Sequence, residues 1–208
     1  MDTALTVLAD VVILATFPLH CRYLSVMLQK GAKYASLEYA FRATLTNLVV
    51  ANLLYFIVFI LVQEPAAYGI FVNFYKDNSW WLGKLFIMQS VPLILLMAFF
   101  HILIAINRVS ALINPMAHMQ FWSEGRINRI IIVFWVVTML ECLPLVYPFE
   151  DAYCIRISPV RTEGVALVIV GELPNLIYQE IAVAIGGLFE IITIVLYVFV
   201  GCRVNKLK

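Results

Sequence analysis

Charged residues are scarce in this chain of 208 amino acids. Asp, Glu, Lys and Arg together make up 13% of the residues, whereas apolar residues make up 63% and the mean hydropathy is +0.95. An average soluble domain carries about twice this proportion of charge. The composition therefore excludes an ordinary soluble domain and predicts a membrane protein.

Several kinds of site are also missing from the sequence. The net charge is +1 and no segment concentrates Lys and Arg, which excludes a nucleic-acid-binding surface. The four cysteines form no CxxC pair and the three histidines are isolated, so we expect no metal site and no cofactor. No GxSxG, P-loop or HExxH motif occurs, and we therefore expect no enzymatic activity.

Long apolar runs are what the sequence has instead. A helix of about 20 apolar residues crosses the hydrocarbon of a bilayer, and five such runs are present. They predict an all-α, polytopic bundle that forms one transmembrane domain over residues 1–208, with an extracellular loop at 147–180. Within that loop, the run VALVIV predicts a short strand or hairpin arm. The predicted spans are 5–28, 44–62, 85–106, 130–146 and 181–200.

The distribution of Lys and Arg predicts the orientation, because cytoplasmic loops keep the excess of positive charge. If the N-terminus lies outside the cell, nine of these residues face the cytoplasm and four face outward. We therefore expect an outer N-terminus and a cytoplasmic C-terminus in the plasma membrane. The nine are Lys30, Lys33, Arg42, Arg108, Arg126, Arg129, Arg203, Lys206 and Lys208, and the four are Lys76, Lys84, Arg156 and Arg161.

Polar residues inside the spans are candidates for binding a ligand, since ionisable groups are costly in hydrocarbon unless they face a partner or water. Gln89, Ser90 and Ile94 lie toward the outer end of the third span, where they would touch a small molecule. Glu141 in the fourth span is the acidic candidate, although it could equally be a protonated carboxyl bonded to a neighbouring helix. Glu190 in the fifth span would face a helix that these residues do not include.

The third span ends in IAINRVSALINP, where Asn107 and Arg108 follow the apolar run. Arg108 could be an anchor that places its guanidinium among the headgroups and fixes the depth of the helix. It could instead lie over a cytoplasmic crevice and bind a signalling partner through its five donors.

A family resemblance bears on this choice. The pattern of Asn107, Arg108 and Ser110 with Pro115 and Trp122 resembles the nematode serpentine chemoreceptors, of the gamma class or a close class of that superfamily. The segment from Leu45 to Leu54 is similar to the second helix of rhodopsin-type receptors, with Asn52 in place of their aspartate. Trp135 and Pro144 resemble the tryptophan and proline of the fourth helix.

The resemblance implies the first five helices of a seven-helix receptor, with Asn107 and Arg108 at the site of G-protein coupling. Three features depart from the pattern. Asn107 replaces the acidic neighbour of the arginine, which removes its local carboxylate. The third span has no outer cysteine to pair with the loop that holds Cys154. Two helices are absent, and we expect a truncated or degenerate receptor.

The predicted function is chemosensory. A small molecule would bind from outside and the bundle would signal to a heterotrimeric G protein, with membrane lipid as the surrounding partner. A transporter or channel subunit is the alternative, in which Asp10, Glu141 and Glu190 would line a polar path. A membrane fragment without signalling activity is the third possibility.

Overall fold

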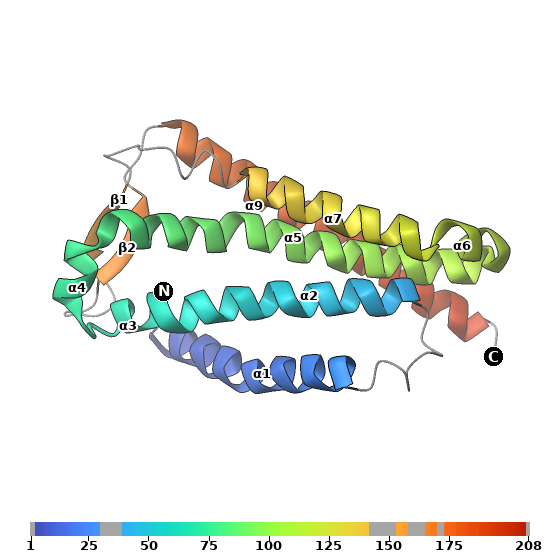
Figure 1. Ribbon diagram of the computed structural model, residues 1–208, viewed down its shortest axis with the longest axis horizontal. Coiled ribbons are helices and arrows are strands. Elements are labelled where there is room, and N and C mark those ends of the chain that lie inside the picture. The colour runs from blue at the N-terminus through green and yellow to red at the C-terminus, as the bar shows by residue number, and fades with distance from the viewer. Residues whose placement is uncertain (1–2, 30–38, 142–152, 158–164, 170–172, 207–208) are drawn as a thin grey trace.

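The fold is described from a computed structural model, which defines the backbone of residues 3–29, 39–141, 153–157, 165–169 and 173–206. Its long elements are helices that lie roughly side by side (Figure 1). They are α1 (Thr3–Gln29), α2 (Tyr39–Val58), α5 (Ser79–Ile113), α7 (Glu124–Glu141) and α9 (Leu173–Lys206). This arrangement confirms the predicted all-α bundle.

Three helical segments in the described part of the chain are long and apolar enough to cross a membrane. They are Tyr39–Ala66, Pro92–Ile113 and Ala184–Val204. The first of them contains α2, a π-helical turn at Phe59–Gln63, and the short α3 at Glu64–Ala67. That helix ends at a turn in which Gly69 has a φ of 73°, a conformation that glycine adopts without a steric penalty.

Short elements connect α3 to α5 at one end of the bundle. Helix α4 (Val72–Asp77) presents a buried Tyr75, whose hydroxyl donates a hydrogen bond to the Leu61 carbonyl at 3.3 Å. Burial raises the pKa of the Tyr75 phenol above its ordinary value, so this hydroxyl keeps its proton. The connection is thereby fixed to the end of the preceding helix.

A β-hairpin lies at the same end, beside α3 and the start of α5 (Figure 1). Its antiparallel strands are β1 (Tyr153–Ile157) and β2 (Val165–Ile169), with Tyr153 opposite Ile169 and Ile157 opposite Val165. The strand predicted from VALVIV is therefore confirmed, and its partner is the segment that contains Cys154.

Helix α5 is the centre of the bundle, because it packs against α2, α7 and α9. Half of its candidate membrane segment is buried inside the protein, whereas only 11% of the α9 segment is buried. The core on the α2 and α7 side of α5 is apolar and aromatic. Its central residues are Leu48, Ala51, Leu96, Phe100, Leu103, Ile104, Ile127 and Ile131.

Candidate functional site

The end of α5 is defined by an Asn-Pro pair. Asn114 has an extended backbone, and its side-chain oxygen accepts a hydrogen bond from the Ala117 amide at 3.1 Å. Pro115 is the first residue of α6 (Pro115–Phe121), a position where its missing N–H costs nothing. The chain therefore leaves α5 and begins a second, short helix directly afterwards.

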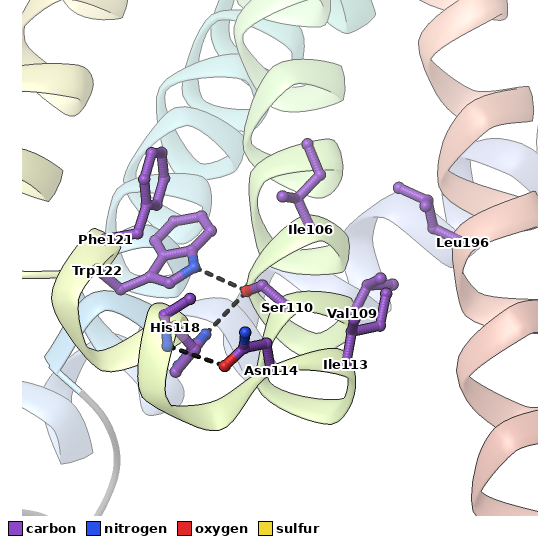
Figure 2. A pocket seen from close by; sticks show the side chains of 10 residues that line it. Ile106, Val109, Ser110, Ile113, Asn114, His118, Phe121, Trp122 and Leu196 are labelled. Carbon is purple, nitrogen blue, oxygen red and sulfur yellow. Dashed lines mark hydrogen bonds between the residues drawn. The ribbon is translucent and has the colours of Figure 1, made fainter.

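Ser110 joins α5 to α6 and to the residue that follows α6. Its hydroxyl oxygen accepts a hydrogen bond from Trp122 Nε1 at 2.8 Å and lies 2.8 Å from His118 Nδ1 (Figure 2). The same hydroxyl donates to the Asn107 carbonyl at 2.9 Å. A hydroxyl has one hydrogen and two lone pairs, so with its hydrogen on this carbonyl it accepts from both rings. His118 and Trp122 are buried, and the three side chains hold α6 against α5.

Asn107 and Arg108 are adjacent on α5 but lie in opposite environments. The Asn107 side chain is 2% exposed, in the interior of the bundle. Arg108 is exposed, and its guanidinium carbon lies 3.9 Å from the centre of the Phe41 ring of α2. Among the described residues, no carboxylate pairs with Arg108. Its position is set by the aromatic ring, which leaves the guanidinium donors open to a partner.

A pocket of about 500 Å³ adjoins this end of α5. It lies between α5, α6 and Leu196 of α9 (Figure 2). Its wall is mainly apolar, with Ser110, Asn114 and His118 as the polar members. Such a wall suits apolar groups, because the Ser110 hydroxyl, His118 Nδ1 and the Asn114 side-chain oxygen already form hydrogen bonds to one another or to α6 (Figure 2). The other lining residues are Ile106, Val109, Ile113, Ala117, Phe121, Trp122 and Leu196.

Three of the four residues predicted to bind a ligand lie far from this pocket along α5. Ile94 is 41% exposed and faces α9, where it approaches Gly186. Gln89 and Ser90 belong to α5 and Glu141 is the last residue of α7. The side chains of these three lie outside the described residues. Within the described residues, no three His, Cys, Asp or Glu side chains gather as metal ligands would.

Three contacts involve residues whose partners sequence reasoning did not identify. Trp135 of α7 donates a hydrogen bond to the Asn47 amide oxygen of α2 at 2.9 Å. Both residues belong to the segments that carried the family resemblance. That resemblance was the sequence signal that could have indicated this contact. His118 and Trp122 both contact Ser110. They are four residues apart in the sequence, and this helical spacing, which puts both on one face, was the signal for the second contact. His101 of α5 contacts Glu190 of α9, and no spacing rule in the sequence predicts this pair.

Comparison with known families shows to which family the chain belongs. Residues 23–155 match the model of the serpentine type 7TM GPCR chemoreceptor family Srx, and no curated protein matches the chain. The match covers more than half of the 208 residues, so the chain belongs to this family of chemosensory seven-helix receptors. The family is one of receptors and not of enzymes. The predicted superfamily is thus confirmed, whereas the gamma class is not.

Proposed function

We propose that this chemoreceptor binds a small molecule at its outer end and couples to a heterotrimeric G protein through Asn107 and Arg108. The observation that carries the proposal is the position of Arg108. It is an exposed cation at the end of the central helix, it is placed by the Phe41 ring, and it has no carboxylate partner among the described residues. A guanidinium so placed can bind carbonyl groups of a partner helix.

The environment of Arg108 supports a protein partner. Asn107 is buried beside it and ties the α5 backbone to Ser110, which in turn bonds to Trp122. This network makes the end of α5 and the short helix α6 one structural unit. The pocket at the same end of α5 supplies an apolar surface that includes Val109, the chain neighbour of Arg108. An apolar surface combined with an exposed arginine is typical of protein interfaces.

The same proposal gives the chain an orientation. The excess of Lys and Arg lies on the side of Arg108, which supports a cytoplasmic position for this end and for the C-terminus. The N-terminus and residues 147–180, which include the hairpin and the first turns of α9, would then lie outside the plasma membrane. All of residues 1–208 form one transmembrane domain in this proposal, with α1 and α7 as spans beside the three apolar segments.

The ligand would enter from the side of the hairpin. Gln89, Ser90 and Ile94 of α5 and Glu141 of α7 are the residues proposed to meet it first. The shift of the bundle between two packings would then change the access of the G protein to Arg108, provided that the ligand binds one packing better than the other. No cofactor, metal, nucleic acid or enzymatic step enters this proposal.

The test is nucleotide exchange on a purified heterotrimeric G protein, with the full chain reconstituted in lipid vesicles. We expect the Arg108→Ala variant to lose most of the exchange that the native chain stimulates, because the exposed cation is gone. Arg108→Lys should retain only part of it, since an ammonium cannot present a planar fork of donors.

Arg129→Ala is the matched control. Arg129 is also exposed at this end of the bundle, but its Nε donates to the Gly125 carbonyl of its own helix at 3.1 Å. We expect near-native exchange from this variant. Equal exchange from the native chain and from Arg108→Ala would contradict the proposed coupling and would leave Arg108 as a membrane anchor.

A further inference from the structure

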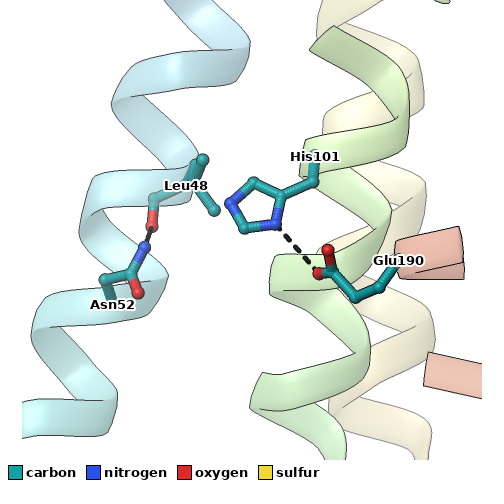
Figure 3. Close-up of polar contacts among 4 residues, drawn as sticks. All are labelled: Leu48, Asn52, His101 and Glu190. Atoms are coloured by element: carbon teal, nitrogen blue, oxygen red, sulfur yellow. Dashed lines mark hydrogen bonds and ion pairs between the residues drawn. The ribbon is translucent and has the colours of Figure 1, made fainter. Parts of the chain in front are cut away.

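An ionisable pair joins the two apolar helices α5 and α9. His101 Nδ1 lies 3.1 Å from Glu190 Oε1 (Figure 3). His101 belongs to the segment Pro92–Ile113 and Glu190 to Ala184–Val204, both of which can cross a membrane. Ionisable groups at such depth are costly unless they have a partner, and they mark functional sites. The structure thus gives Glu190 a partner on α5, rather than the additional helix that we expected.

The pair is open, unlike the buried polar network around Ser110. The side chain of His101 is 41% exposed and that of Glu190 is 49% exposed. On the opposite side of His101, α2 presents Leu48 and Asn52 (Figure 3). The Asn52 amide nitrogen donates to the Leu48 carbonyl at 2.9 Å, which leaves the amide oxygen as an acceptor. A molecule that reaches this level of the bundle can therefore contact the carboxyl group of Glu190.

The polar groups at this level favour one class of ligand. A carboxylate repels an anion, and a neutral molecule brings it no compensating positive charge in an apolar environment. A protonated amine can replace the imidazole, because it brings one positive charge and several N–H donors. The carboxylate then exchanges one hydrogen-bonding partner for another.

We propose that Glu190 is the recognition point for a ligand that carries a protonated amine, and that such a ligand binds by displacing His101 from the carboxylate. This inference rests on the proposed function, in which a small molecule enters from the outer end. Ile94 precedes His101 by seven residues, so it lies on the same face of α5 and about 10 Å farther out along the helix axis. The apolar part of the ligand would lie along Ile94, next to the small Gly186 of α9.

Displacement of His101 has a direct consequence for the bundle. The pair is the hydrogen bond that joins the side chains of α5 and α9 in the described structure. Once the amine holds Glu190, α9 keeps its apolar contacts with α5 but loses this polar one. Occupation of the site would therefore change how α9 packs on the helix that carries Arg108.

The test measures binding of three monoamines, hexylamine, cyclohexylamine and phenethylamine, to the purified full chain in lipid nanodiscs without G protein. Hexanol and hexanoate serve as the neutral and anionic counterparts of hexylamine. We expect saturable binding of at least one amine, and we expect Glu190→Gln to weaken it about tenfold or more, as loss of a charged hydrogen-bond partner does. Hexanoate should not compete with the bound amine.

Two further variants separate recognition from a structural role. Glu190→Asp keeps a carboxylate and should retain most of the affinity for the amine. His101→Phe removes the competing imidazole and should bind the amine at least as tightly as the native chain. A purely structural ion pair would instead make Glu190→Gln and His101→Phe equally unstable, with no selective loss of amine affinity.

The result that would overturn the proposal is an unchanged amine affinity in Glu190→Gln, saturable binding of none of the three amines, or preferential binding of hexanoate. Arg108→Ala, measured in the same assay, should bind the amine as the native chain does. Loss of G-protein activation with intact amine binding would contradict the coupling at Arg108 alone. Intact activation in the native chain without amine recognition would contradict the inference on Glu190 alone.

Discussion

The two sides of α5 are built differently. Toward α2 and α7, α5 contributes Leu96 and Phe100 to a closed apolar core, and side-chain hydrogen bonds such as that from Trp135 to Asn47 join the neighbouring helices. Toward α9, the contacts include a glycine and a half-exposed pair of ionisable groups. The first side has the features of a rigid scaffold, and the second has those of a contact that can change. The predictions below test this difference, from the largest expected effect to the smallest.

The scaffold side should depend most on Trp122. Its side chain is 5% exposed and bonds to Ser110, so Trp122→Ala would remove a buried ring and leave a cavity. We expect a loss of about 3 to 5 kcal/mol in the free energy of unfolding, measured by denaturant titration in detergent micelles. The adjacent Phe121 is 49% exposed, and Phe121→Ala is the control, with a much smaller loss. Equal losses would show that α6 is not held through Trp122.

The α9 side should be sensitive to the size of one residue. A Cβ atom added at Gly186 would lie 3.8 Å from Leu95 Cδ2, so Gly186→Ala fits whereas Gly186→Leu would push α9 away from α5. Overpacking of this kind costs about 1 to 3 kcal/mol. At Gly187 no atom lies within 4 Å of an added Cβ, and Gly187→Leu should leave stability nearly unchanged. The same unfolding measurement compares the two. A greater effect at Gly187 would mean that α9 presents a different face to α5.

Particular residues show how far the sequence could predict this structure. The hydropathy of the apolar runs was sufficient to predict a helix bundle, and six consecutive aliphatic residues predicted the strand that pairs with β1. The end of α5 also depends on local signals, an asparagine cap at 114 and a proline at the first position of α6, although the predicted span ended at 106. Such features depend on residues that are close in the sequence, so the sequence alone can predict them.

Contacts between distant segments could not be predicted in the same way. His101 and Glu190 are separated by 89 positions, and so are Tyr39 and Asn128, which bond across α2 and α7 at 3.0 Å. Helical periodicity gives the face on which a residue lies but not which helix covers that face. Arg108 is the clearest case. The sequence indicated that it lacks a neighbouring carboxylate, but only the packing of α2 on α5 shows that Phe41 takes its place.

The hydrogen bond between Trp135 and Asn47 should contribute less than the packing terms. Trp135→Phe keeps most of the ring and removes the N–H donor, and Asn47→Leu removes the acceptor. Interhelical hydrogen bonds in membrane proteins contribute about 0.6 kcal/mol on average. We expect a coupling of this order from a double-mutant cycle of the two changes, measured as unfolding free energies in micelles. A coupling of zero would show that this hydrogen bond does not stabilise the packing of α2 on α7.

A similarly small effect on stability is expected at Phe41, where the scaffold side meets the proposed coupling residue. Phe41→Leu removes the ring under Arg108 but keeps an apolar side chain of similar reach. The Phe41 ring is partly buried and Arg108 is exposed. A contact between an exposed cation and a ring contributes about 0.5 to 1 kcal/mol, so the fold should persist with little loss. Nucleotide exchange on the G protein should nevertheless fall by a few fold, because the guanidinium is no longer held in one place. Phe41→Tyr keeps a ring and should restore it. If Phe41→Leu leaves exchange unchanged, the G protein itself positions Arg108, and the Phe41 ring contacts the guanidinium without contributing to coupling.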